Sequence, residues 1–453
     1  MQSNHKKFLY CLSLLICLSI LSSSLIFQIT YHKFSSEAVK SNIKLLTSEQ
    51  FEGRLTGSKG CLYASDYIEN SFQNSKLIPY SSSYKESFNV LTPVLNNTQP
   101  QFVIKNKGNV IKSYTYGTDY KEDMTNFRTY NAEFSESDEI YASVNSIIIN
   151  KNNRRYLFHL NSTNNHNFRS SLNIDSKYDF CIDISNSLYN DILNAFRKGY
   201  SISINLPYKL EQSSSYNVAA YIKGTSPSLP PIILCAHYDH LGKDYLGNYY
   251  NGALDNASGT SFLIELSKTF SSLMKPKRTI IFVAFSGEEF GLLGSQNFVY
   301  NHFSKIRNAD VFNFDMIGAP NTDLSFMISN SQLSNCKNSM MFHQLENICK
   351  NKSINYLVDF RDSSDHASFA KLGINSVTIC NSDTSRIHTP NDTLEHIDVK
   401  SINTAYSVIY NEILDLAYNK YFLIIYNPVV PIISCICFII IILLPKVNKK
   451  KTS

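Results

Sequence analysis

The chain has 453 residues, of which 43% are hydrophobic, and it carries 42 lysines and arginines against 37 aspartates and glutamates. This composition is that of a globular protein with room for two or three domains, and it excludes collagen-like and fully disordered chains. Six of the lysines lie in the two tails, so the middle of the chain is nearly neutral and lacks the basic face of a nucleic-acid-binding protein. We therefore expect no nucleic-acid partner.

The first predicted element is a membrane segment. Residues Phe8 to Ile29 carry no charge and follow Lys6 and Lys7, and about 20 apolar residues suffice to cross a bilayer. Residues 1–30 are therefore expected to be a signal anchor or a cleaved signal peptide. The run ends without a clear small-x-small cleavage site, which favours retention, although the serines at 22–24 leave cleavage open.

The body of the chain divides into parts with different patterns. Residues 36–80 have apolar side chains at three- and four-residue steps and are predicted to be helical. Residues 89–210 contain short β-type runs between Asn, Ser and Gly clusters, with one helical segment at 188–198, and are predicted to form a separate, mostly β domain. From 211 to 418 strands and helices alternate, which predicts an α/β fold whose largely parallel sheet is covered by helices on both faces.

Ionisable residues follow the predicted strands of this α/β part. The runs 232–236, 279–285, 311–314 and 376–380 each lead to carboxylates or histidines, and a further aspartate lies in a turn-rich loop before the predicted helix 260–270. In open α/β sheets, ligands bind beyond the carboxyl ends of the strands, so these residues are expected to meet in one crevice. They are His237, Asp239, Asp255, Glu288, Glu289, Asp315 and His388.

The residue types in this set indicate a metal site. Histidines and carboxylates without sulfur suit zinc and, less well, manganese or cobalt. The set holds more carboxylates than one zinc ion needs, which argues for two ions. Two consecutive glutamates allow one carboxylate to bind metal while the other takes a proton from water. Each motif alone is weak, but their order and their placement at strand ends are specific.

Six motifs, in this order, resemble those of the co-catalytic di-zinc aminopeptidases, a family that includes bacterial leucyl aminopeptidases and vacuolar aminopeptidase Y. They are His237-x-Asp239, NGALDNASGT, SGEEFGLLGS, NFDMIG, SSDHASF and HTPNDTLEHID. The resemblance covers residues 36–80 and 211–418 and implies a zinc-exopeptidase fold with a mostly parallel sheet flanked by helices. It implies that residues 36–88 are the N-terminal part of the peptidase domain, that 211–418 are its main part, and that 89–210 are an inserted domain similar to protease-associated domains.

The resemblance also implies a ligand set for two zinc ions. His237 and Asp315 would hold one ion, Glu289 and His388 the other, and Asp255 would bridge them.

The same resemblance assigns the remaining roles. Glu288 would be the general base, and Asp239 would orient His237 through its second ring nitrogen. In this family the peptide bond after the bridging aspartate is commonly cis, so the Asp255–Asn256 bond is expected to be cis.

Four further polar residues have weaker claims to the site. Asp365 and His366 match the family's SSDHASF motif, although a role in tying the loop beneath the site is the simpler interpretation. His240 is interpreted as a loop residue. Arg386 is interpreted as a surface arginine rather than a substrate contact.

The last predicted element is a second membrane segment. An uncharged run from Tyr421 to Pro445 is followed directly by Lys446 and by the lysines at 449–451. Residues 421–445 are predicted to be a transmembrane helix and 446–453 a basic cytoplasmic tail. Because positive charge lies outside both runs, the positive-inside rule places residues 31–420 outside the cytoplasm, at the cell surface or in the lumen of the secretory pathway.

Together these features predict a membrane-anchored zinc aminopeptidase that removes N-terminal residues from peptides, with a metal-bridging water and Glu288 as base. A glutaminyl cyclase is one alternative, but such enzymes typically use one zinc ion surrounded by tryptophan, and this chain has no tryptophan. A carboxypeptidase would need arginines to hold a substrate carboxylate, and only Arg386 is obviously placed. A non-catalytic receptor-like ectodomain is a third alternative, but such proteins usually lose metal ligands.

Overall fold

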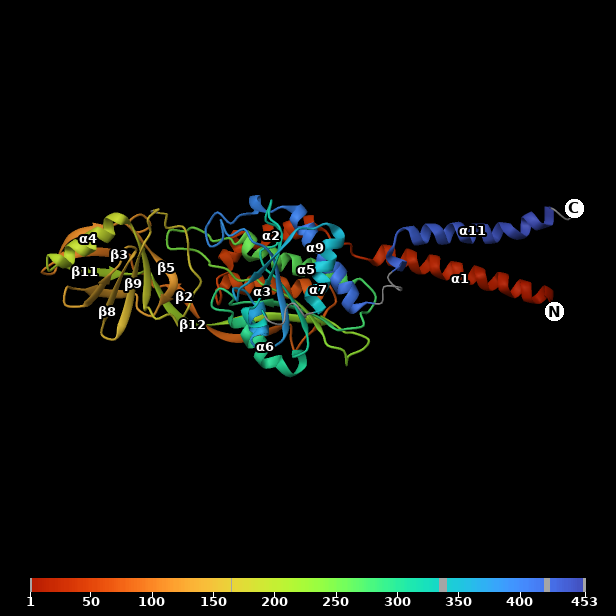
Figure 1. Ribbon diagram of the computed structural model, residues 1–453, viewed down its shortest axis with the longest axis horizontal. Coiled ribbons are helices and arrows are strands. Elements are labelled where there is room, and N and C mark those ends of the chain that lie inside the picture. The colour runs from red at the N-terminus through yellow and green to blue at the C-terminus, as the bar shows by residue number, and fades with distance from the viewer. Residues whose placement is uncertain (1, 164, 334–339, 419–423, 451–453) are drawn as a thin grey trace.

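A nine-stranded mixed sheet forms the centre of the molecule in the computed structural model, which describes residues 2–163, 165–333, 340–418 and 424–450 (Figure 1). Its strands, in spatial order, are β1 (Ile78–Pro79), β12 (Tyr208–Ile222), β14 (Ile280–Phe285), β13 (Ile232–His237), β15 (Asp310–Phe314), β18 (Asn375–Asn381), β16 (Leu324–Ile328) and β17 (Tyr356–Phe360), with β2 (Lys85–Leu95) paired to β12.

The four central strands, β14, β13, β15 and β18, are parallel to one another. Every residue of β13 and β14 is buried, as expected for parallel strands covered on both faces. The flanking strands β12 and β16 join the centre in the antiparallel sense. The centre of the sheet is therefore parallel, as predicted, and β16 and β17 are also parallel to each other, but antiparallel pairs join these parts and form the β12 edge. Since the central strands run the same way, their carboxyl ends meet at one edge of the sheet.

Helices cover both faces of this sheet. Alternate residues of β13 and β14 belong to two different hydrophobic clusters, one on each face. One face packs against α2 (Ser36–Leu46), α3 (Lys59–Asn74), α5 (Gly259–Ser271), α7 (Met340–Lys352) and α9 (Val399–Ala417). The other face packs against α6 (Leu293–Ile306) and α8 (His366–Ala370). Short helical turns are η1 (Glu49–Arg54), η2 (Ala253–Ser258), η3 (Asn330–Gln332), η5 (Leu394–His396) and η6 (Ile424–Tyr426).

Residues 101–205 form two smaller sheets with a hydrophobic core of their own, and we call this part the two-sheet region. One sheet has the order β4 (Asn109–Tyr114), β3 (Gln101–Asn106), β11 (Ser201–Asn205), β6 (Asn131–Phe134). The other has the order β5 (Tyr120–Phe127), β10 (Phe180–Ile184), β9 (Arg154–Leu160), β8 (Ser146–Lys151), β7 (Glu139–Ala142). The helix α4 (Asn186–Arg197) matches the helical segment expected at 188–198. The long strands β2 and β12 join this region to the central sheet (Figure 1).

Two helices at the chain ends extend together from the opposite end of the molecule (Figure 1). They are α1 (Gln2–Thr30) and α11 (Val429–Lys450), and Gln28 near the end of α1 donates a hydrogen bond of 2.6 Å to the carbonyl oxygen of Tyr426. Among the described residues, one helix, Lys7–Thr30, is long and apolar enough to cross a membrane, with a mean hydropathy of 2.2. The apolar part of α11 that passes the same composition test, Val429–Leu443, is shorter.

The second predicted span, 421–445, differs from the observed helix at its start. Residues 421–423 lie outside the described part of the chain, and α11 begins only at Val429. Asn427 accepts a hydrogen bond from the backbone N–H of Val429, and a proline occupies position 428. An Asn cap followed by proline is a strong helix start, which explains why α11 begins at this point.

Candidate metal centre

The residues expected at the strand ends meet at the carboxyl edge of the four parallel strands. His237 is the last residue of β13, Asp315 follows β15 directly, and Glu288 and Glu289 follow β14 after a two-residue turn. His388 lies in the loop after β18. Asp255 lies in the π-helical turn η2 before α5.

One group of ligand atoms surrounds a point between His237, Asp255 and Asp315. The Nε2 atom of His237 lies 3.4 Å from Oδ1 of Asp255 and 3.4 Å from Oδ1 of Asp315. Ligand atoms about 2.1 Å from a tetrahedral zinc ion are about 3.4 Å from one another, so this spacing fits a shared ion. Within the described chain, both ring nitrogens of His237 and Oδ1 of Asp315 are buried without a hydrogen-bond partner, as free ligand atoms would be.

A second group shares Asp255 with the first. The Nε2 atom of His388 lies 3.3 Å from Oδ2 of Asp255 and 3.3 Å from Oε1 of Glu289. Asp255 therefore offers Oδ1 to one group and Oδ2 to the other, which is the arrangement of a bridging carboxylate. The five residues expected to bind two ions lie in two groups around one aspartate.

The loop that carries Asp255 is held by buried polar contacts. Asp392 accepts hydrogen bonds from the backbone N–H groups of Leu254 (2.8 Å) and Asp255 (3.0 Å). The buried guanidinium of Arg54 donates to the carbonyl oxygen of Gly252 at 2.9 Å. Gly252 has φ of 53°, and a Cβ there would lie 2.1 Å from the carbonyl oxygen of Asp255, so only glycine fits. The Asp255–Asn256 peptide bond is cis, as expected.

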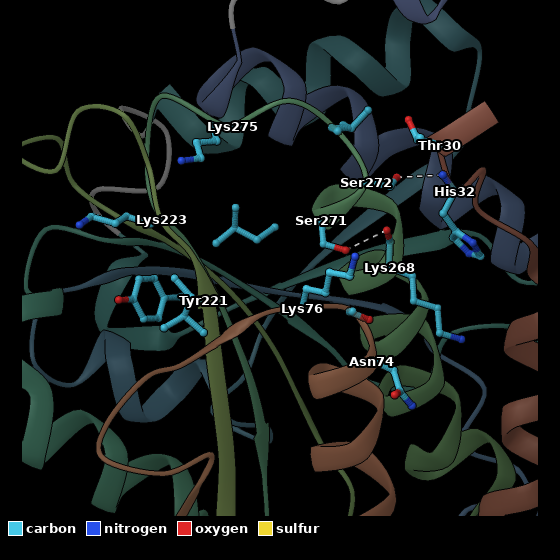
Figure 2. Close-up of a pocket in the computed structure, with 14 residues that line it drawn as sticks. Thr30, His32, Asn74, Lys76, Tyr221, Lys223, Lys268, Ser271, Ser272 and Lys275 are labelled. Carbon is cyan, nitrogen blue, oxygen red and sulfur yellow. Dashed lines mark hydrogen bonds between the residues drawn. The ribbon is translucent and has the colours of Figure 1, made fainter. Parts of the chain in front are cut away.

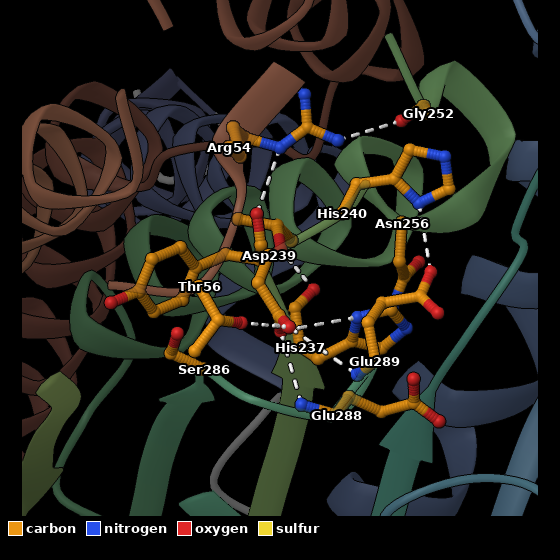
Figure 3. A network of polar contacts seen from close by, with 12 residues as sticks. Arg54, Thr56, His237, Asp239, His240, Gly252, Asn256, Ser286, Glu288 and Glu289 are labelled. Atoms are coloured by element: carbon orange, nitrogen blue, oxygen red, sulfur yellow. Dashed lines mark hydrogen bonds and ion pairs between the residues drawn. The ribbon is translucent and has the colours of Figure 1, made fainter. Parts of the chain in front are cut away.

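Asp239 joins the His237 strand end to the two glutamates (Figure 3). Its carboxylate accepts hydrogen bonds from the backbone N–H groups of Glu288 and Glu289, both at 3.3 Å, and from the hydroxyl of Thr56 at 2.6 Å. Its Oδ1 lies 3.6 Å from Nδ1 of His237, on the side of the ring opposite the ligand group. Asp239 is thus placed to orient His237, at a distance longer than a hydrogen bond.

The carboxylates of this cluster repel one another, and added positive charge would stabilise them. Burial raises the pKa of Glu288 well above its ordinary value, and Glu289 and Asp315 add to this effect although His237 opposes it. Burial alone would lower the pKa of His388, but Glu289 and Asp255 outweigh burial and raise it well above its ordinary value. Four carboxylates thus gather at this edge of the sheet, and metal cations between them would relieve the repulsion.

A cavity of about 270 Å³ is lined by Asp255, Glu288, Glu289, Asp315 and His388. Glu288 is partly exposed to it, and its carboxylate accepts no hydrogen bond from the described residues. The wall includes apolar and sulfur-containing side chains and one arginine, namely Met316, Met327, Arg361, Cys380 and Ile387.

Comparison with known proteins decides what kind of domain holds this site. Residues 217–413 match the model of peptidase family M28. This stretch is a peptidase family M28 domain. The family is one of hydrolases, and all the residues that we expected at the strand ends lie within the M28 domain.

Relatives of the M28 domain are named as proteases and aminopeptidases. The vacuolar membrane protease of Clavispora lusitaniae is 28% identical over 190 residues, which cover 42% of this chain and 18% of that protein. Aminopeptidase YwaD of Bacillus subtilis is 30% identical over 203 residues, which cover 42% of each chain. The chain therefore spans less than half the length of these curated relatives.

A solved structure shares the fold over a longer stretch. The aminopeptidase from Aneurinibacillus sp. strain AM-1 has a TM-score of 0.61 at 17% identity, and the match covers 86% of this chain and 96% of that chain. The likeness of fold thus extends well beyond the M28 domain.

His240, which was interpreted from the sequence as a loop residue, lies after β13 and reaches the second ligand group. Its side chain is fully buried, and its Nδ1 lies 2.9 Å from Oε1 of Glu289. His240, Asp255 and Glu289 also form a group of possible metal ligands. A parallel bridge to Leu55 and a hydrogen bond to the carbonyl oxygen of Arg54 hold the residue in this position. The only feature of the sequence that could have indicated this role is its position directly after the His237-x-Asp239 motif.

The other residues with weaker claims lie as follows. His366 contacts Thr378 at 2.8 Å and the carbonyl oxygen of Arg361 at 2.9 Å, so it ties the loop together as expected. Asp365 is fully buried, and burial with neighbouring carboxylates raises its pKa to about 7. Arg386 forms an ion pair with Asp383.

Several residues that support the site were not singled out from the sequence. They are Arg54, Thr56, Ser364, Asp392 and a segment of the two-sheet region around Ser171. Ser364 donates a hydrogen bond of 2.7 Å to Oδ2 of Asp315. Ser364 and Asp392 lie inside the SSDHASF and HTPNDTLEHID motifs, which was a signal available in the sequence.

A larger cavity of about 680 Å³, which shares no lining residue with the cavity beside the ligand groups, lies beside the end of α1 (Figure 2). The described residues that line it include four lysines and no carboxylate. Two of these, Lys76 and Lys268, lie near the C-terminal ends of α3 and α5, where positive charge complements the helix dipole.

Proposed function

We propose that the chain is a zinc aminopeptidase with two metal ions in the M28 domain. His237 and Asp315 would hold one ion, Glu289 and His388 the other, and Asp255 would bridge them. The observation that carries this proposal is that the two oxygens of Asp255 each face a separate ligand group at 3.3–3.4 Å. The names of relatives, which include a probable zinc metalloprotease from Pyrenophora teres, support zinc as the metal.

The chain's own residues would move the proton. When bound, zinc would polarise the scissile carbonyl and lower the pKa of water. Glu288 faces the same cavity with a carboxylate free of hydrogen bonds from the described residues, so it would take a proton from the attacking water and later give it to the leaving amine. Asp239 would hold His237 in the correct tautomer.

The charge of the cavity favours peptides bound by their N-terminus. Among the carboxylates in the wall, Glu288 is the one not assigned to a metal ion, so it is available to a substrate with a cationic α-amine. A carboxypeptidase would need free arginines, whereas Arg361 in the wall is paired with Asp359 at 2.5 Å and Arg386 is paired with Asp383. The apolar and sulfur-containing wall residues would contact the side chain of the residue that is removed.

The two terminal helices would anchor this enzyme in a membrane. Large apolar side chains on both helices are exposed rather than packed, for example Leu15 at 65% and Ile432 at 60%. Burying such side chains in a bilayer would remove them from water. The helices lie side by side with both chain ends far from the body, which agrees with both termini lying in the cytoplasm and the M28 domain outside it (Figure 1).

The test combines metal content with turnover of peptides. The zinc-loaded chain should release single N-terminal residues from unblocked peptides and should leave N-acetylated peptides intact. The variant Glu288→Gln should keep both ions and lose about 10²- to 10⁴-fold in kcat, because it removes the proton acceptor and leaves the ligands in place. Formation of N-terminal pyroglutamate, release of C-terminal residues, or a zinc-loaded chain without hydrolytic activity would each overturn the proposal.

A further inference from the structure

One segment of the two-sheet region, residues 166–174, contacts the proposed metal ligands. The segment belongs to this region by its own contacts. The backbone N–H of Ser170 donates to Oδ1 of Asp123 at 3.0 Å, and that of Asn173 donates to the carbonyl oxygen of Thr125 at 2.8 Å. The side chain of Leu172 is 1% exposed and packs in the core of the two-sheet region. The segment is therefore fixed to the two-sheet region.

The segment determines which nitrogen of His388 faces the metal centre. The Nδ1 atom of His388 lies 3.0 Å from the carbonyl oxygen of Arg169, and the N–H of Arg169 donates to the carbonyl oxygen of His388 at 3.0 Å. A carbonyl oxygen only accepts hydrogen bonds, so Nδ1 must carry the hydrogen. In the neutral imidazole that binds a metal ion, the lone pair of His388 is then on Nε2, the atom that faces Asp255 and Glu289. The ring of Phe168 is stacked on the imidazole, with centroids 5.6 Å apart.

The segment also holds the second ligand of the same group. The hydroxyl of Ser171 donates a hydrogen bond to Oε2 of Glu289, and the N–H of Leu172 donates to the carbonyl oxygen of Glu289 at 2.8 Å. With Oε2 occupied by Ser171, the other oxygen, Oε1, is directed at His388 and His240. Side chain and backbone of Glu289 are thus both fixed from the two-sheet region.

Buried contacts of Arg169 keep the segment in place against the M28 domain. Its guanidinium is 1% exposed and donates to the carbonyl oxygen of Leu241 at 2.9 Å. It also lies over the ring of Tyr250, 5.0 Å from the centroid. By contrast, the hydrogen bonds and ion pairs of His237 and Asp315 among the described residues do not involve the segment.

We propose that residues 168–172 orient His388 and Glu289, so that the two-sheet region completes one of the two metal sites. Phe168, Arg169 and Ser171 are positioning residues, because they act through the two ligands. This inference rests on the proposed two-metal site. Its specific consequence is that disturbing the segment weakens the ion held by His388 and Glu289 and spares the ion held by His237 and Asp315.

The experiment compares two adjacent serines in the full chain in detergent. Ser171→Ala removes the hydrogen bond to Glu289, whereas Ser170→Ala removes a hydroxyl that has no hydrogen bond with the described residues. Zinc affinities are measured by competition with a chromogenic chelator, which separates the two ions by their dissociation constants. We expect Ser171→Ala to weaken one ion about 10- to 100-fold and leave the other unchanged, Ser170→Ala to match the wild type, and Ser171→Thr to restore binding.

Phe168→Ala provides a second, independent variant. Phe168 is 49% exposed, so its loss is not expected to unfold the chain, and it should weaken the same ion by removing the stacking on His388. A wild-type chain that binds no pair of ions would overturn the proposed function. A wild type that binds two ions while both Ser171→Ala and Phe168→Ala retain both affinities, or lose both equally, would overturn the role of the segment alone.

Discussion

Asp392 offers a sharp test of how the bridging aspartate is held. Its two carboxylate oxygens accept hydrogen bonds from the N–H groups of Leu254 and Asp255, and its side chain is 1% exposed. Asp392→Asn keeps the shape but turns one acceptor into an NH₂ group that faces a backbone N–H. The variant loses a hydrogen bond to a charged acceptor, about 1.5–3 kcal/mol, and leaves a buried N–H without a partner, so we expect a loss of about 3 kcal/mol.

The chain contains a matched control for this substitution. Asp398 also accepts two backbone N–H groups, from Lys400 and Ser401, but at the start of α9, away from the ligand groups. Asparagine caps a helix about as well as aspartate, so Asp398→Asn should cost a few tenths of a kcal/mol at most.

The assay is thermal unfolding of the purified chain together with zinc competition. For a domain of about 200 residues, a loss of about 3 kcal/mol corresponds to a fall in Tm of roughly 6–12 °C. Because Asp255 serves both ligand groups, Asp392→Asn should weaken both zinc ions about tenfold or more, whereas Asp398→Asn should change neither Tm nor affinity. If the two variants had the same Tm and the same zinc affinities, the argument that Asp392 holds the bridging aspartate would be refuted.

Four further outcomes are expected. Removal of metal with a chelator should abolish hydrolysis and lower Tm, and added zinc should restore both. An ion present at 100 times its dissociation constant adds about 2.7 kcal/mol to the free energy of unfolding. Activity in excess chelator would contradict a metal centre. His240→Leu should weaken zinc at the Glu289 group more than at the His237 group, and equal loss at both would disprove a local role. Lys121→Met should destabilise the packing of the two-sheet region on the M28 domain by about 3–5 kcal/mol, because it leaves the buried carboxylate of Asp244, 2.8 Å away, without its cationic partner. An unchanged Tm would show that this ion pair is dispensable. Protease added outside sealed cells should cut within residues 31–420 and leave an epitope at Ser453 intact. Loss of that epitope would show that the predicted topology is wrong.

The strand-end residues could be predicted because their positions follow from local sequence and one general rule. His237 and Asp315 lie directly at the ends of apolar runs, and parallel strands bring their carboxyl ends together whatever the loops do. The cis bond after Asp255 came from the resemblance to a family, not from local sequence.

Other parts of the site depend on contacts between distant segments. His240 points into the site because it pairs with Leu55, almost 200 residues earlier in the chain, and no local pattern encodes that pairing. Ser171 lies in a region without a recognisable motif, yet it contacts Glu289. Likewise, one antiparallel edge of the sheet is formed by the long strand β12, whose sequence does not specify its partners. Single-sequence patterns give the elements and the strand ends, whereas these details follow from tertiary packing.

The central claim is that two metal ions share Asp255, and an anomalous-difference map at the zinc absorption edge tests it most directly. Crystals of the zinc-loaded chain should show two peaks about 3.5–4 Å apart. One peak should lie about 2.1 Å from Nε2 of His237 and from Asp315, and the other about 2.1 Å from Nε2 of His388 and from Glu289, with one oxygen of Asp255 on each. A single peak, or two peaks that do not share Asp255, would contradict the account.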